Sequence, residues 1–378
     1  MDDSFFIHFS ERVKKLQDQE TLDIFDSERA LDNMKVKKPE VDSDEIKFHQ
    51  NITSRIYTPK RNWRAYNQGQ TQEEAMFEDI LIELIDRSII PHTAIRRGRP
   101  FNDLKDMIFC CVMRAYRMKS CRRTIASLDY AKKKGYIKKI PHYNTIFNYY
   151  NTPALTPILE HLIAQSAIPL TQVEMDFASD SSGFSTSMFG RWKDIRIGKE
   201  NLRRLYKKAH ITVGVLTHIV TAAQVTPGHY ADSPIFKTLI KTTAKNFKIR
   251  EVSADKAYLD RKNLQLVADS GGTPFIPFKT NSSTKPRGCM IWSVMRRMYD
   301  ENQDYFLLHY HKRSNVESAF SAIKRKLGQC LYSKTDIGQT NELLCRLLAY
   351  NLTILIHEYF EREIDINFNK CAKAGVAQ

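Results

Sequence analysis

The stretch HITVGVLTHIVTAAQVT, residues 210–226, decides the fold class of this chain of 378 residues. It is rich in β-branched residues and is interrupted at Leu216–His218, which is typical of an antiparallel hairpin. An extended segment before it, TQVEMDFASDSSGF, ends in the turn-forming DSSG. After it the pattern predicts a helix at 232–247, a strand at 250–258, a helix at 261–272 and a strand at 273–279. The sequence therefore predicts an α/β fold with a mixed sheet whose first strands are antiparallel.

Three acidic residues stand at notable points of this pattern. Asp180 follows the first predicted strand, Asp255 follows the fourth, and Glu317 lies on the last long predicted helix. Open sheets bind ligands at strand ends, and two-metal phosphoryl transfer requires several carboxylate ligands. Spacing alone leaves open that these are unrelated surface acids. Glu174 and Asp176 also lie near the first strand and compete with Asp180.

The segment YHKRSNVESAFSAIKRK, from residue 310, sets four residues at the spacing Y-(2)-R-(3)-E-(6)-K: Tyr310, Arg313, Glu317 and Lys324. On one continuous α-helix these positions form a narrow stripe, because each residue advances about 100°. An apolar face lies beside the stripe, made of Val316, Ala319, Phe320, Ile323 and Leu327. A phenol, two cations and one acid suit a site for a metal ion and a phosphate backbone. The alternative is a plain surface ion pair between Arg313 and Glu317.

The charge of the chain is positive and uneven. Its formal net charge is +15 and its pI is about 9.4, which favours a polyanionic partner such as nucleic acid. Residues 1–95 contain 19 acidic and 13 basic side chains, whereas residues 96–150 contain 14 basic and 3 acidic ones. Within the basic segment, RRGRP (96–100) places Arg97 and Arg99 for a DNA minor groove, or serves as a charged linker.

The rest of the basic segment predicts helices. Residues 104–118 have the pattern of a buried helix, and residues 120–151 predict a helix, a turn at Gly135 and a second helix from about Pro141. This resembles a helix-turn-helix, with a helical hairpin carrying solvated lysines as the alternative. The candidate DNA-binding residues are Arg122, Arg123, Lys132, Lys133, Lys134, His142 and Asn144.

The sequence also limits the location of the chain. The most apolar stretch, LLCRLLAYNLTILI, is too short to cross a bilayer, and the N-terminus lacks the pattern of a signal peptide. The seven cysteines are scattered without metal-binding spacing, which favours reduced thiols in a cytoplasmic protein. The expected organisation is an acidic, partly helical region at 1–95, a basic helical region at 96–160, a catalytic domain at 170–362 and a disordered tail at 363–378.

Several blocks of the sequence together resemble a known family. These are DSSGFST (180–186), VTPGHYADSPIF (225–236), SADKAYLDRKN (253–263), IPFKTNSS (276–283) and KRSNVES (312–318). With the complete Y-(2)-R-(3)-E-(6)-K signature, they are similar to the fourth insertion-sequence group of bacterial and archaeal DDE transposases. The similarity covers about 96–360. Only 62 residues separate Asp255 from Glu317, so a β-rich insertion that some relatives carry is expected to be absent.

The resemblance implies a ribonuclease-H-like core in which Asp180, Asp255 and Glu317 bind two Mg²⁺ ions, for which Mn²⁺ can substitute. It implies cleavage at the ends of an insertion sequence and strand transfer into target DNA, by a homodimer on DNA in a prokaryotic nucleoid. The residues expected to contact DNA near the site are Tyr310, Arg313, Lys324, Lys256 and Tyr258. A ribonuclease-H-like nuclease and a DNA-binding regulator derived from a transposase remain alternatives.

Overall fold

The computed structural model describes residues 62–88, 103–186, 206–285 and 287–368. Contacts divide the chain into two units, Met1–Arg64 and Ala65–Gln378, and all the sheet and site residues below belong to the second unit. The predictions for Arg97 and Arg99 lie outside the described residues, as do those for residues 1–61 and 369–378.

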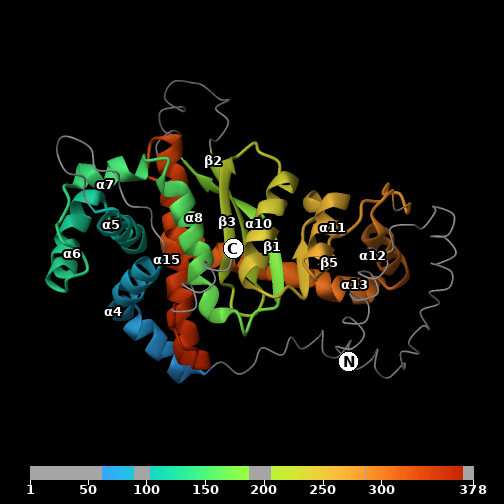
Figure 1. Cartoon of the computed structure of the whole chain (residues 1–378), viewed down its shortest axis with the longest axis horizontal. Coiled ribbons are helices and arrows are strands. Elements are labelled where there is room, and N and C mark those ends of the chain that lie inside the picture. Colours follow the sequence, from blue (N-terminus) through green and yellow to red (C-terminus); the bar gives the residue numbers. More distant parts are fainter. Residues whose placement is uncertain (1–61, 89–102, 187–205, 286, 369–378) are drawn as a thin grey trace. The chain divides into compact units, whose positions relative to one another are not determined.

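One mixed sheet of five strands forms the centre of the second unit (Figure 1). The strands are β1 (Asp176–Ser185), β2 (Tyr206–Gly214), β3 (Val220–Pro227), β4 (Glu251–Ala254) and β5 (Thr273–Phe275). Their order is β3-β2-β1-β4-β5; β1 pairs antiparallel with β2 and parallel with β4, and β5 continues in parallel with β4. The predicted mixed α/β sheet with antiparallel first strands is confirmed.

A buried carboxylate supports the turn between β2 and β3. Glu174 accepts hydrogen bonds from the Thr217 backbone at 2.5 Å, the Thr217 hydroxyl at 2.7 Å and the Leu216 backbone at 3.3 Å. His218 completes the turn with a φ of 63°. Glu174 therefore precedes β1 and serves the hairpin, which removes it as a competitor of Asp180.

Helices cover both faces of the sheet. On one face lie α10 (Ser233–Asn246) and α11 (Arg261–Asp269), where Phe177 of β1 packs against Phe247 with ring centroids 5.4 Å apart. On the opposite face lie α13 (Gln303–Tyr310), the 3₁₀ turn η3 (His311–Arg313) and α14 (Ser314–Leu327). Successive side chains of a strand alternate between faces, so the even-numbered residues of β1 point toward η3 and α14.

Two further long helices complete the layer around β3. The helix α15 (Asp336–Arg362) contacts β3, α5 and α14, and α8 (Leu155–Ser166) packs between α15 and β3. The sequence pattern did not predict α8. At the β5 end of the sheet, α12 (Met290–Glu301) packs against α11.

The basic segment is helical, with a different connection from the predicted one. It contains α5 (Leu104–Arg117), α6 (Cys121–Lys133) and α7 (Tyr143–Tyr150), next to α4 (Trp63–Arg87). The buried helix and the positive φ of Gly135, 80°, are as predicted. However, residues 134–142 separate α6 from α7, which is longer than a helix-turn-helix turn. The short connection, residues 118–120, joins α5 to α6 instead.

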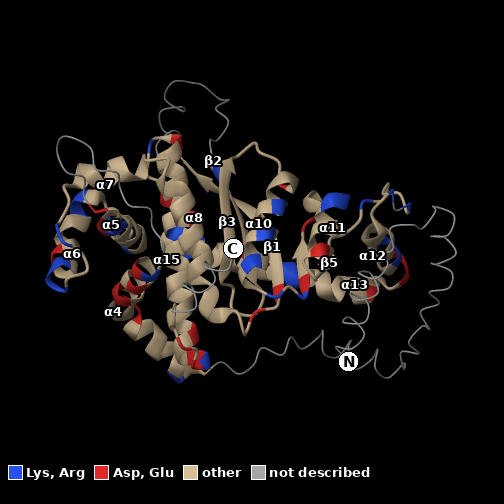
Figure 2. Cartoon of the chain, viewed as in Figure 1, with Lys and Arg blue, Asp and Glu red and all other residues tan. Residues whose placement is uncertain are grey.

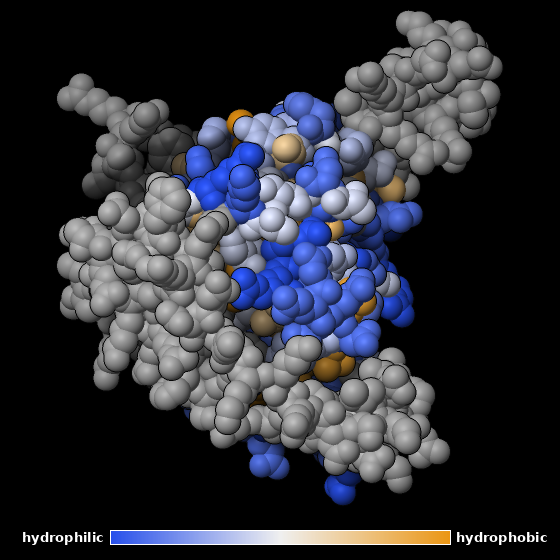
Figure 3. Space-filling view, turned by 90° about the vertical axis from the view of Figure 1, so that its right-hand side faces the viewer, coloured by the Kyte–Doolittle hydropathy of each residue, from blue (hydrophilic) through white to orange (hydrophobic). Residues whose placement is uncertain are grey.

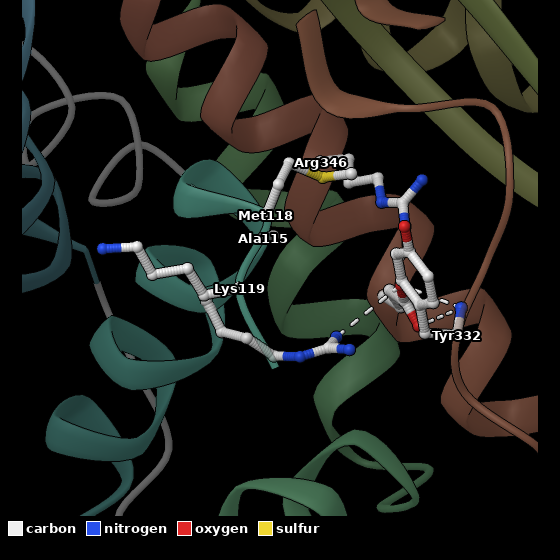
Figure 4. A pocket seen from close by; sticks show the side chains of 7 residues that line it. Ala115, Met118, Lys119, Tyr332 and Arg346 are labelled. Atoms are coloured by element: carbon white, nitrogen blue, oxygen red, sulfur yellow. Dashed lines mark hydrogen bonds and ion pairs between the residues drawn. The ribbon is translucent and has the colours of Figure 1, made fainter. Parts of the chain in front are cut away.

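A buried ion group ties the loop after α14 to α15 and α5. Glu342 accepts from Arg346 at 2.7 Å and lies 3.6 Å from Arg114. Arg346 also donates to two carbonyl oxygens of the loop, and Glu342 accepts from two of its backbone N–H groups. Beside these side chains lies a cavity of about 10 Å³, roughly the space of one water (Figure 4). The group therefore fixes the C-terminal end of α14.

Three features of the remaining chain bear on the predictions. Phe368, inside the predicted tail at 363–378, is buried, and the disorder of that tail stays a prediction. No helix among the described residues has the length and apolar character needed to cross a membrane. The six described cysteines are free, and all except Cys330 are buried.

Candidate functional site

Asp180 and Asp255 lie side by side on neighbouring parallel strands. The last paired residues of β1 and β4 are Ser179 and Ala254, so the two aspartates occupy the next level of the sheet. Asp180 lies within β1, which continues to Ser185, and not after the strand as predicted. Asp255 directly follows β4, as predicted. Strand alternation turns both side chains toward the face covered by η3 and α14.

Glu317 reaches the same face from the first turn of α14. The predicted single helix through Tyr310 and Lys324 is interrupted, because α13 ends at Tyr310 and η3 separates it from α14. The predicted apolar face is confirmed, since all five of its residues are buried. Nor is α14 the last long helix, because α15 follows it. The interruption leaves all four signature residues near the aspartates, as their contacts show.

Arg313 connects two of the three acids. Its Nη1 donates to Asp180 Oδ2 at 2.6 Å, and its Nη2 is hydrogen-bonded to Glu317 Oε1. The ion pair of Arg313 with Glu317, considered above as a plain surface feature, therefore exists as part of a bridge to the sheet. About a fifth of the Arg313 and Asp180 side chains is exposed, 21% and 19%. The bridge is consequently accessible to a ligand from solvent.

The electrostatics of Asp180 indicate that Asp255 and Glu317 lie near enough to affect its charge. Burial raises the pKa of Asp180, and the negative charges of Asp255 and Glu317 raise it further. The backbone N–H of Ser181, at 2.7 Å, and the Arg313 cation act in the opposite direction. A cation placed beside such a carboxyl favours its ionised form and lowers its pKa, because it offsets the repulsion from the neighbouring acids.

The other signature residues line the same surface. Lys324 donates to Ser182 Oγ at 2.7 Å and lies 5.2 Å from the centre of the Phe184 ring. Burial lowers the pKa of Lys324. Tyr310 lies beside Arg313, whose guanidinium is 6.0 Å from the centre of its ring. The structure thus brings all four signature residues to one edge of β1.

The two candidates beside Asp255 have different surroundings. Lys256 is exposed in the 3₁₀ turn η2 (Lys256–Tyr258) and is available to a ligand. Tyr258 is fully buried against Phe236, with ring centroids 5.4 Å apart. Its hydroxyl is buried as well and has no hydrogen-bond partner among the described residues, so the contact of Tyr258 with DNA stays a prediction that this arrangement does not support.

Asp176 belongs to a separate ion cluster at the opposite end of β1. It accepts two hydrogen bonds from Arg250 at 2.7 Å and one from Lys312 at 2.8 Å. Lys312 also pairs with Glu251, which His309 contacts at 2.5 Å. This cluster joins β1, β4 and η3, and it leaves Asp180 as the strand acid of the site. The sequence analysis overlooked Lys312, although it lies in the KRSNVES block.

The three acids have the donor chemistry of a magnesium site. Carboxylate oxygens are the ligands that Mg²⁺ prefers in proteins. Within the described ranges, no three His, Cys, Asp or Glu side chains are already arranged around a common point for a metal. The Arg313 guanidinium stands between Asp180 and Glu317 and supplies the positive charge there. The oxygen donors suit Mg²⁺ by type, but Arg313 occupies Asp180 and Glu317 in this arrangement.

The predicted DNA-binding residues on α6 and α7 are all exposed: Arg122, Arg123, Lys132, Lys133, Lys134, His142 and Asn144. At least four of them already have local contacts: Arg122 lies 4.6 Å from the centre of the Tyr143 ring, and Lys134 lies 4.0 Å from Asp79. Lys133 pairs with Asp129 at 2.8 Å, and His142 caps α7 by accepting from the Asn144 backbone at 3.3 Å. Lys and Arg residues nonetheless lie along α6 and the segment after it (Figure 2).

The central part of the chain is similar to a known protein family. No solved structure matches the chain significantly. Residues 173–352 match the family model described as the transposase DDE domain. The matched region contains all five strands, Asp180, Asp255 and the helix α14 with Glu317, and it supports a DDE transposase.

Proposed function

We propose that this protein is a DDE transposase of the fourth insertion-sequence group with a ribonuclease-H-like core. It binds the ends of an insertion sequence, cleaves them and transfers the cut strands into target DNA. The observation that carries this proposal is the placement of Asp180 and Asp255 at one level of two parallel strands, with Glu317 linked to Asp180 through Arg313. The family match of residues 173–352 supports the DDE transposase part of this proposal.

Asp180, Asp255 and Glu317 would hold the metal, most simply two Mg²⁺ ions, with Mn²⁺ as a substitute. When bound, such ions lower the pKa of a nucleophilic water or 3′-hydroxyl and stabilise the leaving oxygen. The carboxylates supply hard oxygen donors and a negative surface that only cations neutralise. No covalent link between enzyme and DNA is required.

The cations of the signature position the phosphate. Arg313 would exchange its carboxylate contacts for a bidentate contact with a DNA phosphate, whereas Lys324 acts as a point charge. Tyr310, on the same edge, would donate to a phosphate or pack on a sugar. The exposed Lys256 is suited to a phosphate on the Asp255 side.

The exposed cations of α6 and Lys134 after it, together with His142 and Asn144 at the start of α7, would bind the transposon ends in a homodimer on DNA. The proposal also includes a prokaryotic origin and an association with the nucleoid, which rest on the family resemblance alone.

End cleavage with Mg²⁺ tests the catalytic assignment. We expect Asp180→Asn, Asp255→Asn and Glu317→Gln each to abolish cleavage, while Asp304→Asn, an exposed acid of α13, retains it. Wild-type cleavage by all three site variants would rule out the assignment. Supplying pre-cut ends separates a transposase, which joins them to target DNA, from a nuclease or a DNA-binding regulator, which do not.

A further inference from the structure

The chain that leaves β5 emerges beside the acids. Because β4 and β5 are parallel and Ser253 pairs with Phe275, this chain passes the level of Asp255 immediately after the strand. Residues 276–278 are buried, and Lys279 is the first exposed residue. The loop at 279–285 therefore lies on the same edge of the sheet as the acids. Ligands of open sheets gather at this edge.

This loop and the start of α11 form a basic surface, which we call the β5 rim. Its cations are Arg261, Lys262, Lys279, Lys285 and Arg287. No acidic residue occurs in the sequence between Asp269 and Asp300. The nearby Asp260 uses its carboxylate to cap α11, accepting from the Lys262 backbone at 2.8 Å. Lys and Arg are visible around α11 and before α12, and the face on this side is mainly hydrophilic (Figures 2 and 3).

The loop is held in place by the helices beneath it. Four side chains donate to its carbonyl oxygens: Trp292 to Ser283 at 2.7 Å, Ser293 to Thr284 at 3.1 Å, Arg261 to Lys285 at 3.3 Å and Arg296 to Lys279 at 3.4 Å. Arg261 also stacks over the Trp292 ring at 4.1 Å. A loop fixed in this way loses little further backbone entropy when its exposed lysines bind a ligand.

We propose that the β5 rim binds the phosphates of the target DNA duplex. This inference rests on the proposed function, because strand transfer requires a second duplex at the acids. The exposed cations of α6, assigned above to the ends, lie on the opposite side of the sheet from α11 and α12 (Figure 1). Two separate basic surfaces thus flank one set of acids. Phosphate contacts position DNA without reading its sequence, which suits a target of variable sequence.

The test compares charge reversal at the rim with the same change elsewhere. Lys279→Glu with Lys285→Glu is the test variant. Lys245→Glu with Lys248→Glu is the matched control, because these lysines are also exposed but precede β4 at the other end of the strands. The probes are a random-sequence duplex, an end duplex and pre-cut ends with target DNA. Lys279→Gln with Lys285→Gln repeats the test without introducing negative charge.

We expect the test variant to bind the random duplex about tenfold more weakly and with a salt dependence reduced by about two contacts. The ratio of strand transfer to end cleavage falls with it, and the control keeps the wild-type ratio. An unchanged ratio, or an equal loss of end binding and random-duplex binding, would overturn the inference. A failure of the proposed function would be seen in a different protein: Asp180→Asn, with the β5 rim unchanged, would still cleave transposon ends.

Discussion

The guanidinium of Arg313 donates a hydrogen bond to Asp180 Oδ2 at 2.6 Å. This is the carboxylate that we propose binds the metal ion, so Arg313 occupies a position that the ion would take. The same side chain is also hydrogen-bonded to Glu317. One cation therefore joins the strand acid to the helix acid across the gap between β1 and α14. We therefore expect Arg313 and Mg²⁺ to compete for the carboxylates of Asp180 and Glu317.

This competition predicts opposite effects of one substitution. Arg313→Ala should bind Mg²⁺ more tightly than the wild type, because the competing cation is gone. End cleavage should fall by about 10²–10³-fold, as it does when one group that stabilises a transition state is removed. Titration calorimetry with Mg²⁺ and a cleavage assay measure the two effects.

Arg313→Lys is the matched control, since it keeps the charge and loses the fork geometry. It should leave Mg²⁺ affinity near the wild-type value while cleavage stays low. Weaker Mg²⁺ binding by Arg313→Ala would show that Arg313 holds the carboxylates in place for the metal, contrary to the prediction.

Asp180→Asn should separate stability from metal binding. Burial and neighbouring acids raise the pKa of Asp180, so its ionised form disfavours the folded state, and stability falls as pH rises from the unfolded pKa through the folded one. The neutral amide removes that cost. Mg²⁺ at 100 times its dissociation constant should stabilise the wild type by about 2.7 kcal/mol and the variant by almost nothing. Thermal unfolding with and without Mg²⁺ at pH 7 measures this, and equal stabilisation of both proteins would contradict it.

Asp176→Asn should have the reverse profile. Burial alone would raise the pKa of Asp176, but hydrogen bonds from Arg250 and Lys312 keep it below its ordinary value. The carboxylate therefore contributes stability above the unfolded pKa, and this is lost as pH falls through the folded one. We expect a loss of about 1–3 kcal/mol at pH 7, with Mg²⁺-dependent cleavage retained below the melting temperature. A stable variant without cleavage would instead place Asp176 in the catalytic site.

Charge reversal on α6 tests end binding. Replacing Lys132 and Lys134 by Glu should weaken binding to an end duplex and reduce the slope of its salt dependence by about one for each lost contact. Lys133 is left unchanged because its ion pair with Asp129, at 2.8 Å, is closer than the 4.0 Å contact of Lys134 with Asp79. Unchanged affinity and slope would favour the helical hairpin with solvated lysines.

The sequence predicted the sheet well because its signals are local. β-Branched residues, a turn at Leu216–His218 and the alternation of helices and strands each depend on short stretches of chain. The strand acids and Glu317 were identified because they lie in motif blocks. The sequence could not establish that Asp180 and Asp255 share one face of the sheet, because this depends on the register of β1 against β4.

The missed features depend on contacts between distant segments. Asp176 was a reasonable candidate until the structure showed it bound by Arg250 and Lys312, which lie 74 and 136 residues away in the sequence. The break of the helix at η3 has no proline or glycine to announce it. Burial of Tyr258 likewise depends on α10, because Phe236 covers its ring.

His210 makes a further prediction about pH. It is fully buried on β2, where its Nε2 lies 2.8 Å from Thr226 Oγ1 and its Nδ1 lies 3.3 Å from Asp232. Burial lowers the pKa of His210 to about 4, which Asp232 opposes and Lys208 reinforces. The unfolded chain therefore binds a proton at a higher pH than the folded one, so stability is fully present above pH 6.5 and is lost as pH falls toward 4. Between pH 7 and pH 5 the protonation of His210 in the unfolded chain should lower the free energy of unfolding by about 2 kcal/mol.

Urea unfolding at pH 7 and pH 5 measures this effect. The free energy of unfolding of His210→Gln should differ less between the two pH values than that of the wild type, whereas His229→Gln, which changes an exposed histidine, should match the wild type. An identical pH dependence in His210→Gln would mean that His210 is already protonated in the folded protein, paired with Asp232.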